Sequence, residues 1–187
     1  MYTQDHTFSG QDYTTQPLPK GEYEACTFSN CAFTNGNLSE VVFVDCTFEG
    51  CDLSAANISN AGFREVQFID CKLMGLRFES INPFLFASAF DRCQLNLCSF
   101  YQCVLKKVRF NQCSLKEVDF GEADLTEARL PDCDLTGAIF EQTNLQKADL
   151  RTAMNYTIDP ENNRIKKARF SRDGLLGLLG KYDIVVK

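Results

Sequence analysis

A five-residue periodicity dominates this sequence and limits the folds that it can adopt. Every fifth residue from Tyr23 to Phe78 is large and apolar, and a second series with the same spacing runs from Phe90 to Leu150, two residues out of phase with the first. Side chains on one face recur every 3.6 residues in an α-helix and every second residue in a β-strand. A period of five therefore fits neither element.

The other positions of each five-residue unit follow a second rule. Two residues before each large apolar residue the side chain is small, with Leu76 as the exception, and the remaining positions are mostly polar. If each unit turns the chain through about a right angle, the large and the small residue both point inward and twenty residues complete one turn. Successive turns would stack at the strand spacing of about 4.8 Å. The 25 units of the two series predict about six turns.

These units resemble those of the pentapeptide-repeat family, whose loose consensus is Ala, then Asp or Asn, then Leu or Phe, then two polar residues. Ala123-Asp124-Leu125-Thr126-Glu127 is an example, and the resemblance covers roughly residues 21–152. We expect an all-β fold, a right-handed quadrilateral β-helix with a short C-terminal helix and strand as a cap. Residues 1–20 would form an irregular segment or a first coil, residues 21–152 the β-helix with a two-residue bulge near 81–88, and residues 153–187 a hairpin, helix and strand.

The twenty-residue frame sorts the inward residues into columns, as matched layers of a packed interior would. One column consists of six cysteines, which fit either small buried apolar residues or a ladder that forms disulfides or binds metal. We favour burial, because the chain has no Cys-x-x-Cys pair and a single histidine, His6, and we expect no metal or cofactor. The predicted core contains Phe28, Phe48, Phe68, Phe90, Phe110, Leu53, Leu73, Leu95, Leu115, Leu135, Cys31, Cys51, Cys71, Cys93, Cys113 and Cys133.

The phase shift falls in a segment that breaks the pattern, residues 79–89. Its two added residues must bulge from one edge of the coil, and Pro83 lacks the backbone donor that a stacked sheet would use. Phe84 and Phe86 cannot both point inward in the five-residue frame. One of them is either exposed as a contact for a partner or folded over the bulge to cover it.

The first twenty residues and the cysteine content indicate a cytoplasmic protein. Residues 1–20 are polar and have neither a basic start nor an apolar run of a signal peptide, and no apolar stretch approaches the roughly 18 residues that span a bilayer. The ten cysteines would stay reduced in the cytoplasm.

After Leu150 the pattern ends, and we expect a hairpin over residues 155–170, a helix from Ser171 to Tyr182 and a last strand at 183–186. This tail resembles that of the topoisomerase-directed members of the family, the Qnr and MfpA quinolone-resistance proteins and the immunity proteins against albicidin and microcin. The resemblance implies a homodimer joined end to end. The residues expected in the cap and dimer interface are Leu175, Leu176, Leu178, Leu179, Ile184, Val185 and Val186.

The two ends of the chain differ in charge. Residues 1–80 carry 11 acidic and 4 basic side chains, whereas residues 151–187 carry 4 acidic and 8 basic ones. Such an acidic coil would be steered toward basic clefts. Lys106, Lys107 and Arg109 form the only dense basic cluster of the coil, so we do not expect direct nucleic-acid binding. Besides Phe84 and Phe86, the candidate partner contacts are Asp45, Glu65 and Asp70.

The family resemblance implies a protein that binds DNA gyrase or topoisomerase IV by mimicking DNA and gives resistance or immunity to a poison of that enzyme. The chain lacks the long loop insertions that Qnr proteins use in protecting gyrase. Plain blocking of the enzyme, as the resemblance to MfpA implies, needs no such loops, so both protection and inhibition stay open. The alternative is an interaction scaffold for an unrelated partner, because one fold hosts many functions. Catalysis is not expected, since the chain has one histidine, no Gly-rich phosphate loop and no nucleophile motif.

Overall fold

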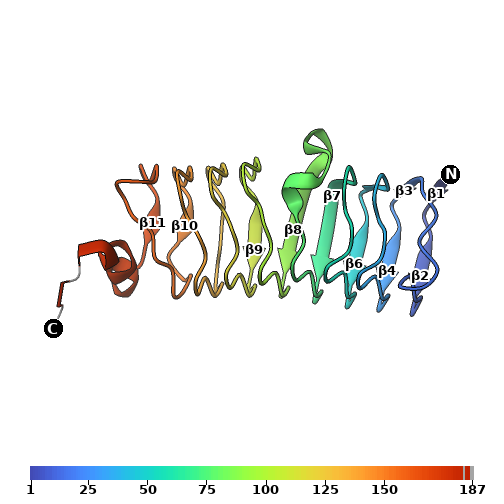
Figure 1. The fold of residues 1–187 in the computed structure, drawn as a ribbon, viewed down its shortest axis with the longest axis horizontal. Coiled ribbons are helices and arrows are strands. Elements are labelled where there is room, and N and C mark those ends of the chain that lie inside the picture. The colour runs from blue at the N-terminus through green and yellow to red at the C-terminus, as the bar shows by residue number, and fades with distance from the viewer. Residues whose placement is uncertain (183, 186–187) are drawn as a thin grey trace.

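The computed structural model describes residues 1–182 and 184–185, without the side chain of Leu85. The chain forms an all-β solenoid of about eight turns, stacked in one row with the two termini at opposite ends (Figure 1). This is the fold that the five-residue period predicts, but the estimate of six turns is too low. Residues 1–20 and 151–170 coil as well, because each pairs in parallel with the turn beside it.

Short parallel strands occupy two neighbouring sides of the solenoid. Partners lie 20 residues apart, as Phe28 and Phe48 do, and 22 apart between Phe68 and Phe90. Single parallel bridges such as Asp12 to Ala32 hold the other two sides. The strands are β1 (Tyr2–Gln4), β2 (Thr7–Ser9), β3 (Glu22–Glu24), β4 (Thr27–Ser29), β5 (Val42–Val44), β6 (Thr47–Glu49), β7 (Gly62–Ile69), β8 (Phe86–Asp91), β9 (Arg109–Asn111), β10 (Asp149–Leu150) and β11 (Arg169–Phe170).

The corners of the coil are made by residues in the left-handed region. In most units the residue two places after the large apolar one has a positive φ. Among the described residues, 23 that are not glycine have a φ between 51° and 63°, nearly all of them at this position. This conformation costs an L-residue roughly 1–2 kcal/mol. The corner N–H offsets part of that cost by bonding to the next turn, as the Asp45 N–H does to the Arg64 carbonyl at 2.9 Å.

The polar residue just before each large apolar residue explains the Asp or Asn of the repeat. The Asp124 Oδ1 accepts a hydrogen bond from the Thr126 N–H at 3.0 Å, and the Asp52 Oδ1 accepts one from the Ser54 N–H at 3.0 Å. These Asx turns satisfy a corner donor that the ladder between turns leaves free.

Stacked aromatic rings fill the interior. Along one side the rings of Phe8, Phe28, Phe48, Phe68, Phe90 and Phe110 lie nearly parallel, with neighbouring centroids 4.7–5.3 Å apart. All sixteen residues of the predicted core are at most 2% exposed. The rings therefore follow the turn spacing of the backbone, and each turn adds one layer to a continuous core.

A protruding segment interrupts the coil between β7 and β8. It contains two short 3-10 helices, η1 (Phe78–Ser80) and η2 (Pro83–Leu85), and rises above the row of turns in Figure 1. The Asn82 N–H still bonds to the Ala61 carbonyl at 2.9 Å, while Phe86 already pairs with Phe63, 23 residues away. The added residues thus leave the coil at one corner, and the stacking resumes beyond them.

The C-terminal segment differs from its sequence prediction in three ways. Residues 155–170 form another turn and not a hairpin, since β11 pairs in parallel with β10. The expected helix consists of two 3-10 segments, η3 (Asp173–Leu178) and η4 (Gly180–Tyr182). Gly174 and Gly177 pack so closely against Tyr156 that a Cβ would lie 2.0 Å and 2.3 Å from its atoms, which holds the segment flat on the last turn.

The third difference concerns the expected last strand. Ile184 and Val185 have no strand conformation, whereas Asp183 and Val186 lie outside the described residues. Among the described residues, the end of the solenoid is therefore covered by η3.

Candidate functional site

Two of the three predicted acidic contacts share one corner of the solenoid. Asp45 and Glu65 lie one turn apart in the left-handed region, with φ of 51° and 54°, and both are exposed. Within the described part of the chain neither carboxylate forms an ion pair. They therefore present unpaired negative charge on the N-terminal half of the rod.

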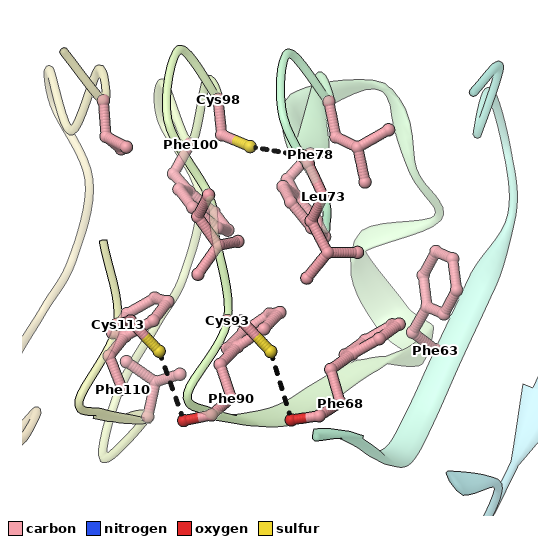
Figure 2. Close-up of a cluster of buried hydrophobic side chains, with 14 of the residues drawn as sticks. Phe63, Phe68, Leu73, Phe78, Phe90, Cys93, Cys98, Phe100, Phe110 and Cys113 are labelled. Carbon is pink, nitrogen blue, oxygen red and sulfur yellow. Dashed lines mark hydrogen bonds between the residues drawn. The ribbon is translucent and has the colours of Figure 1, made fainter. Parts of the chain in front are cut away.

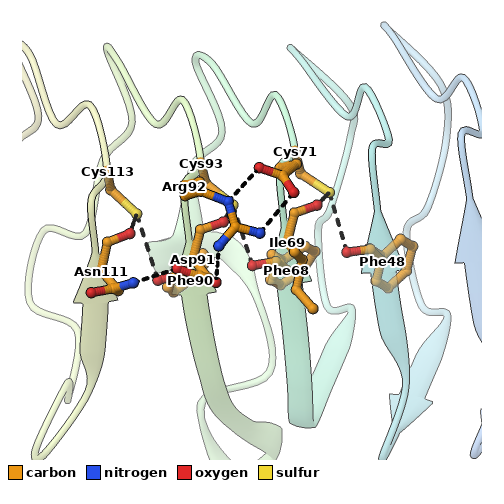
Figure 3. Close-up of polar contacts among 11 residues, drawn as sticks. Phe48, Phe68, Ile69, Cys71, Phe90, Asp91, Arg92, Cys93, Asn111 and Cys113 are labelled. Atoms are coloured by element: carbon orange, nitrogen blue, oxygen red, sulfur yellow. Dashed lines mark hydrogen bonds and ion pairs between the residues drawn. The ribbon is translucent and has the colours of Figure 1, made fainter.

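Asp70, the third acidic contact, is neutralised by an arginine. The Arg92 guanidinium donates from Nε and Nη2 to the two Asp70 carboxylate oxygens at 2.8 Å each, and it also binds Asp91 (Figure 3). Hydrogen bonding to Arg92 lowers the pKa of Asp70. The two side chains lie one turn apart in the same column, so the pair links neighbouring turns and leaves little acidic charge for a partner.

The structure separates Phe84 from Phe86. Phe84 lies at the tip of the protruding segment and is 93% exposed, and its N–H donates to the Asn82 Oδ1 at 3.1 Å. Phe86 is half-buried and packs against Phe78, with ring centroids 5.7 Å apart. Phe86 therefore covers the bulge, and Phe84 is the side chain that could contact a partner.

The six-cysteine column lies inside the solenoid, and all ten cysteines are free thiols. Each thiol of the column donates to a backbone carbonyl of the neighbouring turn, as the Cys93 Sγ does to the Phe68 carbonyl at 3.3 Å (Figure 2). Thr143 makes the same bond from an equivalent inward position, with its Oγ1 2.8 Å from the Phe120 carbonyl. The thiol thus supplies a small donor for a carbonyl that points inward.

Burial also disfavours the thiolate form of two cysteines outside this column, Cys46 and Cys98. It raises the pKa of Cys46 to about 11 and that of Cys98 to about 12. A thiol is a nucleophile and a metal ligand mainly as a thiolate. Among the described residues, no group of three or more His, Cys, Asp or Glu side chains is arranged to hold a metal ion.

The apolar residues of the C-terminal segment divide into two groups. Leu178 packs against the core of the last turn, and Leu179 is half-buried. Leu175 and Leu176 are 48% and 56% exposed. Ile184 and Val185 are also exposed, at 56% and 84%, and Val186 lies outside the described residues.

A basic surface on the C-terminal half is the feature that the sequence interpretation missed. A groove of about 690 Å³ runs along two neighbouring columns of the solenoid. It is lined by Lys107, Arg109, Glu127, Arg129, Lys147, Asp149, Arg151 and Arg169. The twenty-residue frame contains the signal, since Arg109, Arg129 and Arg169 occupy the same position of their turns, but a count of neighbouring basic residues does not find it.

No helix in the described part of the chain is long and apolar enough to cross a membrane. The elongated coil offers open grooves and stripes of side chains. Its geometry therefore suits contact with a large partner along its sides or at its ends.

Solved structures with the same fold include proteins of different roles. A trypsin-treated form of QnrB1, a plasmid-mediated fluoroquinolone resistance protein, is 17% identical with a TM-score of 0.66, over 99% of both chains. HetL, involved in heterocyst differentiation regulation in the cyanobacterium Nostoc, is 16% identical with a TM-score of 0.60, over 93% of this chain and 88% of its own. No protein of curated function matches the chain in sequence.

The repeat itself has a clear match. The family model described as Pentapeptide repeat region matches residues 22–83 and 81–150, which is more than half of the chain. The two matches meet at the protruding segment, where the period changes phase. The chain belongs to the pentapeptide-repeat family.

Proposed function

We propose that the protein is a non-catalytic binding module for DNA gyrase or a related type II topoisomerase such as topoisomerase IV. Its acidic N-terminal half would occupy the DNA-binding groove of the enzyme in place of DNA. By doing so in the cytoplasm it would give resistance or immunity to a topoisomerase poison.

The unpaired carboxylates at one corner of the N-terminal half carry this proposal. Asp45 and Glu65 lie one turn apart in the coil. Four further carboxylates lie at this corner or on the two sides of the rod that meet there. A regular row of negative charge on a narrow rod raises its rate of association with a basic groove. The further carboxylates are Asp5, Glu22, Glu24 and Glu49.

DNA mimicry would be confined to that half. The corner column that contains Asp45 and Glu65 continues with Lys107, Glu127 and Lys147, and Lys147 pairs with Glu127 at 2.9 Å. The sign of the charge therefore changes near the middle of the rod. A topoisomerase would accommodate about four turns of the solenoid, and the other half would lie outside its DNA groove.

A supercoiling assay with purified gyrase, with and without a fluoroquinolone, tests the proposal. We expect the wild-type protein either to inhibit supercoiling or to protect it from the drug at micromolar concentration. The double variant Asp45→Lys, Glu65→Lys should lose this effect by about tenfold or more, because it reverses the charge of the unpaired corner.

The matched control is Glu117→Lys, Asp132→Lys. Both residues are exposed, have φ of 55° and lie on other corners of the rod, so the control changes net charge and backbone strain equally. It should retain the wild-type effect. The absence of both inhibition and protection by the wild-type protein would sink the proposal.

The alternative function is a scaffold for an unrelated protein partner, and the exposed Phe84 favours it. Phe84 is 93% exposed on the protruding segment, so its whole ring is free to be buried against a partner. Phe84→Ala should leave the folded protein unchanged. If it abolishes the effect on gyrase while the acidic double variant does not, the contact is made by the protruding segment and mimicry is wrong.

A further inference from the structure

The groove on the C-terminal half combines six cations with only two carboxylates. We propose that it binds the phosphate backbone of a nucleic acid duplex, without sequence preference. This inference is independent of the proposed function, because it concerns the opposite half of the rod and needs no topoisomerase.

The register of the coil brings the arginines of the groove together. Their backbones pair in parallel from one turn to the next. Arg109 pairs with Arg129 and Arg129 with Asp149, and Asp149 then pairs with Arg169. Neighbouring turns are about 5 Å apart, as the Phe90 and Phe110 ring centroids show at 5.0 Å. The side chains of Arg109 and Arg129 therefore start from neighbouring turns on the same side of the rod, and both line the groove.

The carboxylates of the groove are already engaged. Asp149 pairs with Arg151 at 2.7 Å and lies 3.9 Å from Arg169, while Glu127 pairs with Lys147. In the described residues Lys107, Arg109 and Arg129 have no acidic partner. The two carboxylates of the groove do not balance its six cations. Arg is well suited to bind phosphate with two parallel hydrogen bonds.

The extent of the groove indicates a polyanion. Its cations are spread over four turns, from Lys107 to Arg169, which is too far for a single phosphate group to contact. The regular backbone of a duplex places one phosphate after another along such a row.

The chemistry of the lining favours nucleic acid over an acidic protein. Protein interfaces usually have a core that is depleted of charged residues and enriched in aromatic ones. All eight residues that line this groove are charged. The acidic corner of Asp45 and Glu65 lies further along the same side and would repel phosphate, so the bound duplex would end before it.

Fluorescence anisotropy of a fluorescein-labelled DNA duplex of about 20 base pairs tests the proposal at several salt concentrations. We expect saturable binding by the wild-type protein that weakens with salt. Arg109→Gln, Arg129→Gln should weaken binding by about tenfold or more and reduce the slope of log K against log salt by about 2, since two phosphate contacts are lost.

The matched control is Lys72→Gln, Lys116→Gln, which removes two positive charges from another side of the rod, where both lysines are exposed. It should bind DNA within about twofold of the wild-type protein, because it leaves the groove intact. Circular dichroism and thermal unfolding establish that both variants are folded.

Three results would overturn the proposal. The first is the absence of saturable DNA binding at low salt. The second is an equal loss of binding in both variants, which would attribute the binding to net charge. The third is salt-sensitive self-association in sedimentation velocity that Arg109→Gln, Arg129→Gln abolishes while no DNA binds. That outcome would mean that the groove binds the acidic half of a second copy of this chain.

Discussion

At the scale of single residues, the corners of the coil are conformationally strained. Leu97 is an apolar residue, 62% exposed, with a φ of 62° at a position where most proteins would place glycine or asparagine. Its N–H bonds to the Lys116 carbonyl of the next turn at 2.9 Å. The side chain makes no visible contribution to the core, so its effect on stability acts through the backbone.

Leu97 therefore offers a direct test of corner strain. Leu97→Val should lower the free energy of unfolding by about 1–2 kcal/mol, because a β-branched residue fits the left-handed region poorly. Leu97→Gly should change it by less than about 1 kcal/mol, since relief of strain offsets the greater entropy of the unfolded chain. Guanidinium denaturation measures both variants.

The control for the valine is Arg64→Val, at an exposed position in the extended strand β7. It should be neutral or slightly stabilising, because β-branched residues suit strands. Equal stability of the valine and glycine variants at Leu97 would show that the corner is not strained.

The buried thiols make the stability depend on alkaline pH. Burial raises the pKa of Cys46 to about 11 and of Cys98 to about 12, from an ordinary value of 9.0. Below pH 9 both the folded and the unfolded state keep these protons, so the thiols give no pH dependence. Above it the unfolded state loses protons that the folded state keeps, and the free energy of unfolding falls between about pH 9 and pH 12.

Guanidinium denaturation at pH 8 and at pH 10, in the presence of a reductant, measures this decline. In Cys46→Ala, Cys98→Ala the decline from pH 8 to pH 10 should be smaller, although the variant is less stable at both values. The same decline in both proteins would mean that other groups cause it.

At the scale of elements, the five-residue period was sufficient to predict the solenoid. It fixes which residues point inward, and it places the phase shift at the protruding segment, because each unit is a local structure that its neighbours repeat. The period was not sufficient for the first turn and the last, where Pro17 and Pro19 and the apolar residues after Leu150 obscure it. There the structure shows the coil through parallel pairing with the neighbouring turn, β1 with β3 and β10 with β11.

The candidate sites were harder to predict than the fold. Reading the columns located Asp45 and Glu65 and also places Asp70 one turn from Arg92, but no sequence signal distinguished Phe84 from Phe86. Whether a phenylalanine covers a bulge or points to solvent depends on where Asn82 turns the chain. The basic groove escaped for a related reason. Lys107 and Arg109 were found as a local cluster, but the other cations of the groove lie one or more turns away and become their neighbours only after coiling.

At the scale of the whole molecule, the two ends of the solenoid expose backbone and apolar side chains that must be covered. At the C-terminal end η3 covers the last turn through Leu178, yet a group of apolar residues on η3 and after it is exposed. These residues are Leu175, Leu176, Tyr182, Ile184 and Val185. We infer a homodimer in which this end meets the same surface of a second copy, the closed arrangement typical of two-fold symmetric pairs.

Sedimentation velocity at micromolar concentration tests the dimer. The wild-type protein should sediment as a dimer and Leu175→Glu, Leu176→Glu as a monomer, because the variant would bury four carboxylates at a two-fold interface. Its thermal unfolding should resemble that of an isolated chain, since both leucines are about half-exposed there.

Leu178→Ala should instead keep the dimer and lower the free energy of unfolding by about 1–2 kcal/mol, because Leu178 packs against its own core. A monomeric wild-type protein would leave η3 as a cap alone, and the exposed leucines would then need another partner.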